Sequence, residues 1–133
     1  MDSKDCLFCK LKNVTENIVY QTEDLYVIVD RYPMSNRHLL VIPKQHSPVL
    51  HMCEDSILAK LLVLAKTLAL RLKMEKYNII QNNINQQLVP HVHLHLVECN
   101  SSGSFKFRSY STIKLSDEEY SNVVKEVKEL LNK

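Results

Sequence analysis

Short apolar runs along the chain predict several strands. Residues 18–20, 26–29, 39–42 and 77–81 are rich in β-branched and aromatic side chains, which is typical of strands. Turn-forming residues separate the first two runs, and this spacing predicts a hairpin. Pro43 ends the third run, because proline cannot donate to a strand ladder. Residues 105–110 form a weaker strand candidate.

Residues 91–97 alternate between histidine and apolar side chains. Successive side chains of a strand point to opposite faces, so His91, His93 and His95 share one face of the predicted strand. The apolar side chains between them anchor its other face in a core. The pattern therefore predicts a buried strand that presents a row of imidazoles.

Two segments repeat apolar residues at helical spacing. Residues 57–72 carry them in steps of three and four, and Asp55 or Ser56 can cap the start of this helix. Its wide apolar stripe predicts that it packs against a sheet. Ser116 and Glu119 have the spacing of a capping box, and the apolar positions after them predict a C-terminal helix.

These elements predict an α+β fold, because strands and helices do not alternate as regular βαβ units. We expect a mostly antiparallel sheet of about five strands, a long central helix and a C-terminal helix. The 133 residues contain no repeat, low-complexity tract or linker. We therefore interpret 1–133 as a single domain, long enough to bury a core.

Composition excludes several classes of function. Seventeen basic and fifteen acidic residues leave a net charge of +2, too little for a broad nucleic-acid surface. No apolar run reaches the length of a membrane helix, and the N-terminus lacks the pattern of a secretory signal. We expect no membrane or nucleic-acid partner, and a cytoplasmic location with the nucleus as an alternative. The single glycine, Gly103, excludes a glycine-rich phosphate loop.

The histidine row has three interpretations. A half-exposed strand that happens to carry histidines is the least informative, because core packing does not select imidazoles on one face. One metal ion bound by all three is opposed by geometry, since residues two apart in a strand are ~6.6 Å apart and a metal lies only ~2.1 Å from each nitrogen. The third is catalysis, because a neutral imidazole can attack phosphorus and neighbouring imidazoles can supply protons.

The row from His91 to Val97 resembles the His-φ-His-φ-His-φ-φ signature (φ apolar) of the histidine triad nucleotide hydrolases and transferases. The segment Cys6-Leu7-Phe8-Cys9-Lys10 is similar to the family's N-terminal start. Asp30 and residues 38–46 are similar to its central segment. The resemblance covers a core of about 6–97, and the tail 98–133 is variable in the family.

The resemblance implies a hydrolase that acts on the α-phosphate of adenosine phosphoramidates or dinucleoside polyphosphates. His93 would form a covalent adenylyl-histidine intermediate, and a nucleoside monophosphate would be released. His95 and His38 would bind phosphate oxygens and orient the nucleophile, while Asp30 would accept hydrogen bonds from the ribose. The resemblance also implies a purine nucleotide, with adenosine preferred, and a homodimer paired through a helix and an edge strand.

Other positions correspond to the family's substrate pocket. Phe8, Leu11 and Ile28 match residues that line the nucleobase site, and core packing is their alternative role. Asn82 would supply a phosphate-binding amide, and Gln87 matches the family's glutamine.

The loop 81–90 departs from the family pattern, being about two residues shorter. Gln86 stands where glycine is expected, and Leu88 replaces a small hydroxyl residue that can help the leaving group. The departure puts leaving-group preference and rate in question. Arg37 stands where glycine commonly precedes His38, and either adds charge near the phosphates or is a solvated turn residue.

Cys6-x-x-Cys9 has the spacing of a metal or redox pair in a reducing compartment. Some branches of the resembled family hold structural zinc with this pair, a histidine at the position of His46, and the first triad histidine, here His91. Two cysteines and two histidines would close a tetrahedral site and leave no open position for metal catalysis. His91 would then hold the strand beside His93. The alternative is a free cysteine pair.

Two rival functions follow from the departures. The altered loop allows a non-catalytic, zinc-containing module that binds nucleotide or protein partners. A nucleic-acid-processing member of the superfamily is opposed by the short chain and its near-neutral charge. The Cys pair and residues 43–46 favour the phosphoramidase-like branch, whereas the tail favours the bacterial-type or dinucleoside polyphosphate branches.

Overall fold

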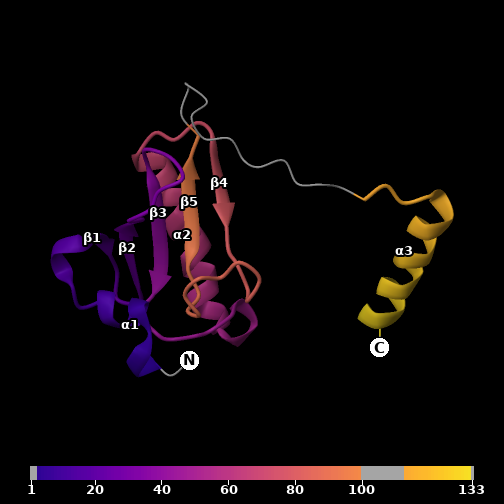
Figure 1. The fold of residues 1–133 in the computed structure, drawn as a ribbon, viewed down its shortest axis with the longest axis horizontal. Helices are drawn as coiled ribbons and strands as arrows, with labels where there is room; N and C mark the ends of the chain where they lie inside the picture. The colour runs from indigo at the N-terminus through magenta and orange to yellow at the C-terminus, as the bar shows by residue number, and fades with distance from the viewer. Residues whose placement is uncertain (1–2, 100–112, 133) are drawn as a thin grey trace.

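The computed structural model describes residues 3–99 and 113–132, and the strand candidate at 105–110 lies outside them. A five-stranded antiparallel sheet of order β1-β2-β3-β5-β4 forms the centre of the fold (Figure 1). Its strands are β1 (Ile18–Gln21), β2 (Leu25–Val29), β3 (His38–Pro43), β4 (Tyr77–Ile80) and β5 (Leu94–Glu98). The predicted α+β class, the hairpin of β1 and β2 and the end of β3 at Pro43 are confirmed.

The described residues form three α-helices: α1 (Leu7–Leu11), α2 (Asp55–Arg71) and α3 (Asp117–Leu131). Short 3-10 turns lie at Ser3–Asp5, Thr15–Asn17 and Leu50–Met52. The capping box of Ser116 and Glu119 is confirmed at the start of α3. The predicted cap of α2 is wrong: Glu54 precedes the helix without a side-chain cap, and its carbonyl accepts the amides of Ile57 and Leu58. Asp55 already lies inside the helix.

Two apolar clusters lie on opposite faces of the sheet. Helix α2 covers one face (Figure 1), where its leucines pack against alternate residues of β2, β3 and β5. The other face carries Tyr26, Ile28, Leu40 and Ile42, which pack against Phe8 and its neighbours from the N-terminal segment. Each buried leucine or isoleucine contributes about 1.5–3 kcal/mol relative to exposure. Because side chains alternate between the two faces of the strands, the second face also carries apolar residues, and the short N-terminal helix α1 packs against them.

The sequence predicts that β5 begins at His91, but it begins at Leu94, which pairs with Val41 of β3. The partner strand ends at Pro43, which has no N–H for a ladder bond. Residues 91 and 92 instead donate their amides to the carbonyls of Val89 and Ser47. The first histidines of the row therefore lie on a segment that has left the sheet, whereas His95 lies within it.

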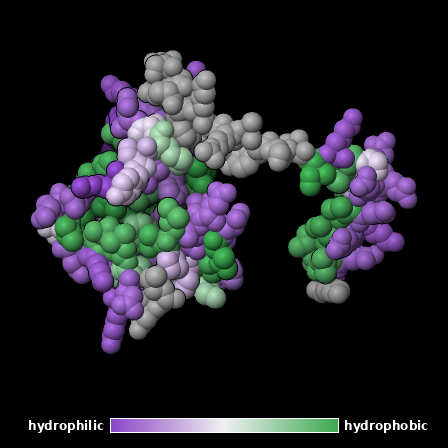
Figure 2. All heavy atoms as spheres, in the orientation of Figure 1, coloured by the Kyte–Doolittle hydropathy of each residue, from purple (hydrophilic) through white to green (hydrophobic). Residues whose placement is uncertain are grey.

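Helix α3 presents an exposed apolar side, formed by Tyr120, Val123, Val127 and Leu130. Figure 2 shows apolar side chains gathered along this side of the helix. None of the helices in residues 3–99 and 113–132 is long and apolar enough to cross a membrane.

Candidate functional site

The three histidines of the row have three different surroundings. His91 joins Cys6, Cys9 and His46 in a group that we call the Cys/His cluster. His95 joins Asp30 and His38 in a second group, the Asp/His cluster. His93 lies between the two clusters. The centroid of its ring is 4.9 Å from that of His95, and its Nδ1 contacts the carbonyl of His91, a member of the Cys/His cluster.

Short contacts connect the members of the Cys/His cluster. The Nδ1 atom of His91 lies 3.3 Å from Cys6 Sγ, 3.6 Å from Cys9 Sγ and 3.1 Å from His46 Nδ1. Cys9 Sγ lies 3.4 Å from His46 Nδ1. Cys6 is the N-cap residue immediately before α1, Cys9 lies in the middle of α1, and His46 follows the end of β3. The cluster therefore joins the N-terminal segment to the sheet.

The four atoms of the Cys/His cluster fit a tetrahedral zinc ion. Zinc–sulfur bonds of ~2.3 Å and zinc–nitrogen bonds of ~2.05 Å imply nitrogen–nitrogen edges of ~3.3 Å and nitrogen–sulfur edges of ~3.6 Å, close to the contacts above. His91 Nε2 donates to the Pro43 carbonyl at 2.8 Å, so its Nδ1 lone pair points into the cluster. Burial and the adjoining Cys6 thiol raise the pKa of Cys9, so deprotonation of Cys9 here would require a nearby cation.

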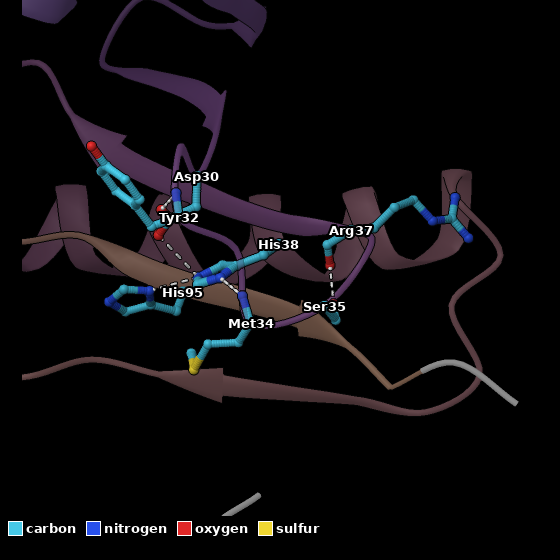
Figure 3. A network of polar contacts seen from close by, with 7 residues as sticks. All are labelled: Asp30, Tyr32, Met34, Ser35, Arg37, His38 and His95. Carbon is cyan, nitrogen blue, oxygen red and sulfur yellow. Dashed lines mark hydrogen bonds and ion pairs between the residues drawn. The ribbon is translucent and has the colours of Figure 1, made fainter. Parts of the chain in front are cut away.

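His38 is at the centre of the Asp/His cluster (Figure 3). Its Nε2 lies 2.8 Å from His95 Nδ1 and 3.4 Å from Asp30 Oδ2, and its Nδ1 lies 3.1 Å from the amide of Met34. Asp30 Oδ1 accepts the amide of Tyr32 at 2.8 Å. Asp30 therefore stabilises the loop after β2 and also faces the histidine pair.

Burial keeps both rings of the Asp/His cluster neutral near pH 7. It lowers the pKa of His95 to about 4, and the neighbouring rings of His93 and His38 contribute in the same direction. It also lowers the pKa of His38, although the Asp30 carboxylate acts in the opposite direction. Because both rings are neutral, they can form a hydrogen bond of 2.8 Å without electrostatic repulsion between like charges.

His93 is a neutral imidazole, and within residues 3–99 and 113–132 no hydrogen bond engages its second ring nitrogen. Its Nδ1 donates to the carbonyl of His91 at 2.7 Å, which leaves the lone pair on Nε2. Burial lowers its pKa and outweighs both that hydrogen bond and the charge of Asp30. The ring of Phe8 packs edge-on against it with centroids 4.8 Å apart. This combination of a fixed ring and an available lone pair suits nucleophilic attack.

The predicted pocket residues lie mostly in the core on this face. Phe8 and Ile28 are buried, and Leu11 is partly buried beside them. Phe8 also contacts His91, with ring centroids 5.9 Å apart, so it touches two histidines of the row. The hydrogen bond that Tyr26 donates to the Phe8 carbonyl holds α1 in place.

The loop 81–90 is tied to residues 47–50. Gln87 uses both ends of its side-chain amide: Nε2 donates to the Pro48 carbonyl at 2.7 Å, and Oε1 accepts the Ile84 amide at 2.9 Å. Asn82 is half-buried, and its carbonyl accepts a hydrogen bond from the Gln81 side chain. The structure thus gives Gln87 a role in holding the loop.

Non-glycine residues adopt left-handed backbone conformations in this loop. Ile84 has φ 64° and Gln86 has φ 58°, values that glycine adopts without steric cost. Gln86 stands where the resembled family commonly has glycine, so the tight turn is kept at the expense of some strain. Leu88 is almost fully exposed.

Arg37 points away from the Asp/His cluster (Figure 3). It forms a bidentate ion pair with Glu98, whose Oε1 lies 2.9 Å from Arg37 Nη2. The pair links the start of β3 to the end of β5, as does the bond from the Glu98 amide to the Arg37 carbonyl. Of the two roles considered for Arg37, a structural one beside the strands agrees with this geometry.

Two contributors to the site leave no recognisable pattern in the sequence. One is the Met34 amide, which no side-chain pattern can reveal because every residue except proline has an N–H. The other is α1, whose five residues are too few to show helical periodicity. Both act through position on the backbone.

The sequence is similar to known proteins along most of its length. The sequence matches the family model of the HIT domain over residues 12–101. It is 38% identical to adenosine 5′-monophosphoramidase HNT1 of Saccharomyces cerevisiae, over 69% of this chain and only 61% of the yeast protein. It is 31% identical to a HIT-like protein of Mycoplasma genitalium, over 95% of this chain and 96% of that protein.

A solved structure has the same fold. The histidine triad nucleotide-binding protein from Candida albicans superposes with a TM-score of 0.83 and 28% identity, covering 96% of this chain and 98% of that one. The family match begins after Cys6, Phe8 and Cys9, so the residues that α1 contributes lie outside it.

Proposed function

Because this chain belongs to the HIT domain family, we propose that it is a nucleotide hydrolase that cleaves at the α-phosphate of an adenosine phosphoramidate or a dinucleoside polyphosphate. The observation that carries the proposal is the state of His93, whose Nδ1 donates to the His91 carbonyl and whose Nε2 lone pair is free. The related monophosphoramidase from yeast supports an adenosine-containing substrate.

In the proposed reaction, His93 Nε2 attacks the α-phosphorus. A phosphorus–nitrogen bond forms, and the bond from phosphorus to the leaving group breaks as the leaving atom takes up a proton from solvent, which the attacking water gives back in the second step. Water then cleaves the adenylyl–His93 bond, which releases a nucleoside monophosphate and restores the imidazole. His95 stabilises charge on the phosphoryl oxygens. His38 positions His95 and does not itself bind phosphate, because its two ring nitrogens contact the Met34 amide and His95 Nδ1. Asp30 accepts hydrogen bonds from the ribose.

The proposal includes one structural zinc ion held by Cys6, Cys9, His46 and His91. Zinc would supply a rigid cross-link and, with all four positions taken by the protein, no catalytic water. The cross-link would fix the position of α1. Since Phe8 of α1 packs against the ring of His93, it would also restrict the orientation of that ring.

A homodimer completes the proposal. β4 is an edge strand of the sheet, and its Tyr77 and Ile79 are exposed. The apolar side of α3 is exposed as well. Such surfaces are typical of subunit contacts.

Turnover assays with an adenosine phosphoramidate and with diadenosine tetraphosphate, run side by side, test the function. We expect the wild type to hydrolyse at least one substrate, and His93→Ala to lose about 10³-fold or more. His38→Ala and His95→Ala lose less, because neither bonds to phosphorus. His51→Ala, which changes an exposed histidine outside both clusters, is the matched control.

Brief incubation with a radiolabelled adenylyl donor tests the covalent step. An acid-labile label is expected on the wild type and absent from His93→Ala. Equal labelling of both proteins contradicts the assignment of His93. A wild type that binds nucleotide but hydrolyses neither substrate supports the alternative, a non-catalytic binding module, which the engaged amide of Gln87 favours.

A further inference from the structure

The backbone amide of Met34 determines which nitrogen of His38 carries the proton. A backbone N–H can only donate, so His38 Nδ1, 3.1 Å away, must accept. A neutral imidazole has one acceptor and one donor nitrogen, and the proton of His38 therefore lies on Nε2. The two nitrogens are the only polar atoms of the ring, so the contact at Nδ1 is enough to assign the proton to Nε2.

The same constraint passes from His38 to His95. His38 Nε2–H points at His95 Nδ1, 2.8 Å away, while Asp30 Oδ2 is the more distant acceptor at 3.4 Å. His95 Nδ1 therefore accepts, and the proton of a neutral His95 lies on its Nε2. Figure 3 shows that this second nitrogen points away from His38.

We propose that the Met34 amide is a positioning group that fixes His38 and His95 as Nε2–H tautomers, so that His95 offers a hydrogen-bond donor to the substrate phosphate. The inference rests on the proposed function for its catalytic consequence, but the tautomers follow from the contacts alone. Met34 acts through its backbone, and its side chain is not required.

The tautomers also decide against a metal ion in the Asp/His cluster. Two histidines and a carboxylate with atoms within 4.8 Å are a common metal-binding set. A metal on His38 Nε2 would need a lone pair there, and the displaced proton on Nδ1 would then face the Met34 N–H. The Cys/His cluster has the opposite arrangement, because the Pro43 carbonyl takes the outer proton of His91.

Nuclear magnetic resonance of the zinc-loaded wild type, labelled with ¹⁵N in its histidines, tests the tautomers directly near pH 7. Two-bond nitrogen–proton correlations should show His38 and His95 protonated on Nε2 and His93 protonated on Nδ1. The His38→Asn and His95→Asn variants assign the signals. An Nδ1–H tautomer at His38 or His95 overturns the proposal, whether or not the protein hydrolyses nucleotides.

A pair of variants separates the Met34 amide from its side chain. Met34→Pro removes the N–H, and we expect mixed tautomers at His38 with kcat lowered at least ~10-fold and KM little changed. Met34→Leu keeps the amide and should match the wild type in both. Equal losses in the two variants, or unchanged tautomers in a folded Met34→Pro, contradict the proposal. If Met34→Pro does not fold, the wild-type spectrum still decides.

A metal titration gives an independent readout. Cobalt(II), which is paramagnetic, is added to zinc-loaded protein, and the signals of His38 and His95 are followed. We expect no selective broadening at one equivalent. Stoichiometric broadening of both rings, abolished by Asp30→Asn but not by the control Asp24→Asn, would show a metal site and overturn the inference.

Discussion

The Cys/His cluster and the Asp/His cluster contain similar atoms at similar distances, yet their chemistry differs. Each brings potential metal ligands within 4.8 Å of one another. In the first, the outer nitrogen of His91 donates to the Pro43 carbonyl, so the inner nitrogen offers a lone pair. In the second, the outer nitrogen of His38 accepts from the Met34 amide, so the inner nitrogen offers a proton.

The difference shows that the hydrogen bond at one ring nitrogen determines whether the other nitrogen is a donor or an acceptor. A backbone carbonyl behind the ring prepares it for a cation, and a backbone amide behind the ring prepares it to donate. His93 follows the first rule, since the His91 carbonyl leaves it a free lone pair. Its described contacts are the His91 carbonyl and the rings of Phe8 and His95, and none of these is a metal-binding thiol.

Removal of Cys6 and Cys9 should change the free energy of unfolding more than any other substitution proposed. It also distinguishes the Cys/His cluster, which we expect to hold zinc, from the Asp/His cluster, which we expect to hold no metal. Zinc present at 1,000 times its Kd stabilises the folded state by ~4 kcal/mol, and the Cys6→Ser, Cys9→Ser double variant should lose this stabilisation. Elemental analysis and urea unfolding measure metal content and the free energy of unfolding. His38→Asn is the control, and we expect it to keep one zinc per chain. Wild-type protein that contains no metal after purification with zinc contradicts the assignment.

Acid should act next most strongly, through the Asp/His cluster. The pKa of His95 is about 4 in the folded state and ~6.5 in an unfolded chain. Between these values the unfolded chain binds more protons, so stability is full above pH ~6.5 and falls as the pH drops toward 4. We expect a loss on the order of 3 kcal/mol from this group by pH 4.

Urea unfolding from pH 7 to pH 4, with zinc kept saturating, measures this dependence. His95→Asn should show a shallower decline than His51→Asn, which changes an exposed histidine. Equal slopes in the two variants would mean that buried His95 does not carry the acid sensitivity.

Asp30 should contribute a smaller, substrate-specific effect. Each charge-assisted hydrogen bond contributes ~1.5–3 kcal/mol, so Asp30→Ala should weaken ribonucleotide binding at least ~10-fold and lose most of the discrimination against a 2′-deoxy nucleotide. Both nucleotides are measured against both proteins, with Asp24→Ala as the control. Since Asp30 also accepts the Tyr32 amide, unchanged discrimination with lower stability would leave it only the loop role.

Arg37 should matter least, because its ion pair with Glu98 lies outside both clusters. Arg37→Ala should change kcat/KM by less than about 2-fold and lower stability by at most ~1 kcal/mol. Glu98→Ala should cause a similar loss of stability. A tenfold fall in kcat/KM for Arg37→Ala alone would place its charge at the phosphates.

Much of the fold could be predicted from local patterns. The leucine repeat of α2, the capping box of α3 and the apolar runs of the strands are short-range signals, and each is confirmed. The start of β5 could not be predicted, because it depends on where its partner ends at Pro43. The cap of α2 was also misplaced, since a backbone carbonyl, that of Glu54, accepts the first helical amides.

The sequence by itself determined that three imidazoles lie in one row, because side chains two apart share a face of an extended chain. It also determined which ligand types could hold zinc. Only the tertiary structure assigned the three histidines to separate surroundings. A ring's proton position depends on the group behind it, and the Pro43 carbonyl and the Met34 amide reach His91 and His38 only after the chain has folded.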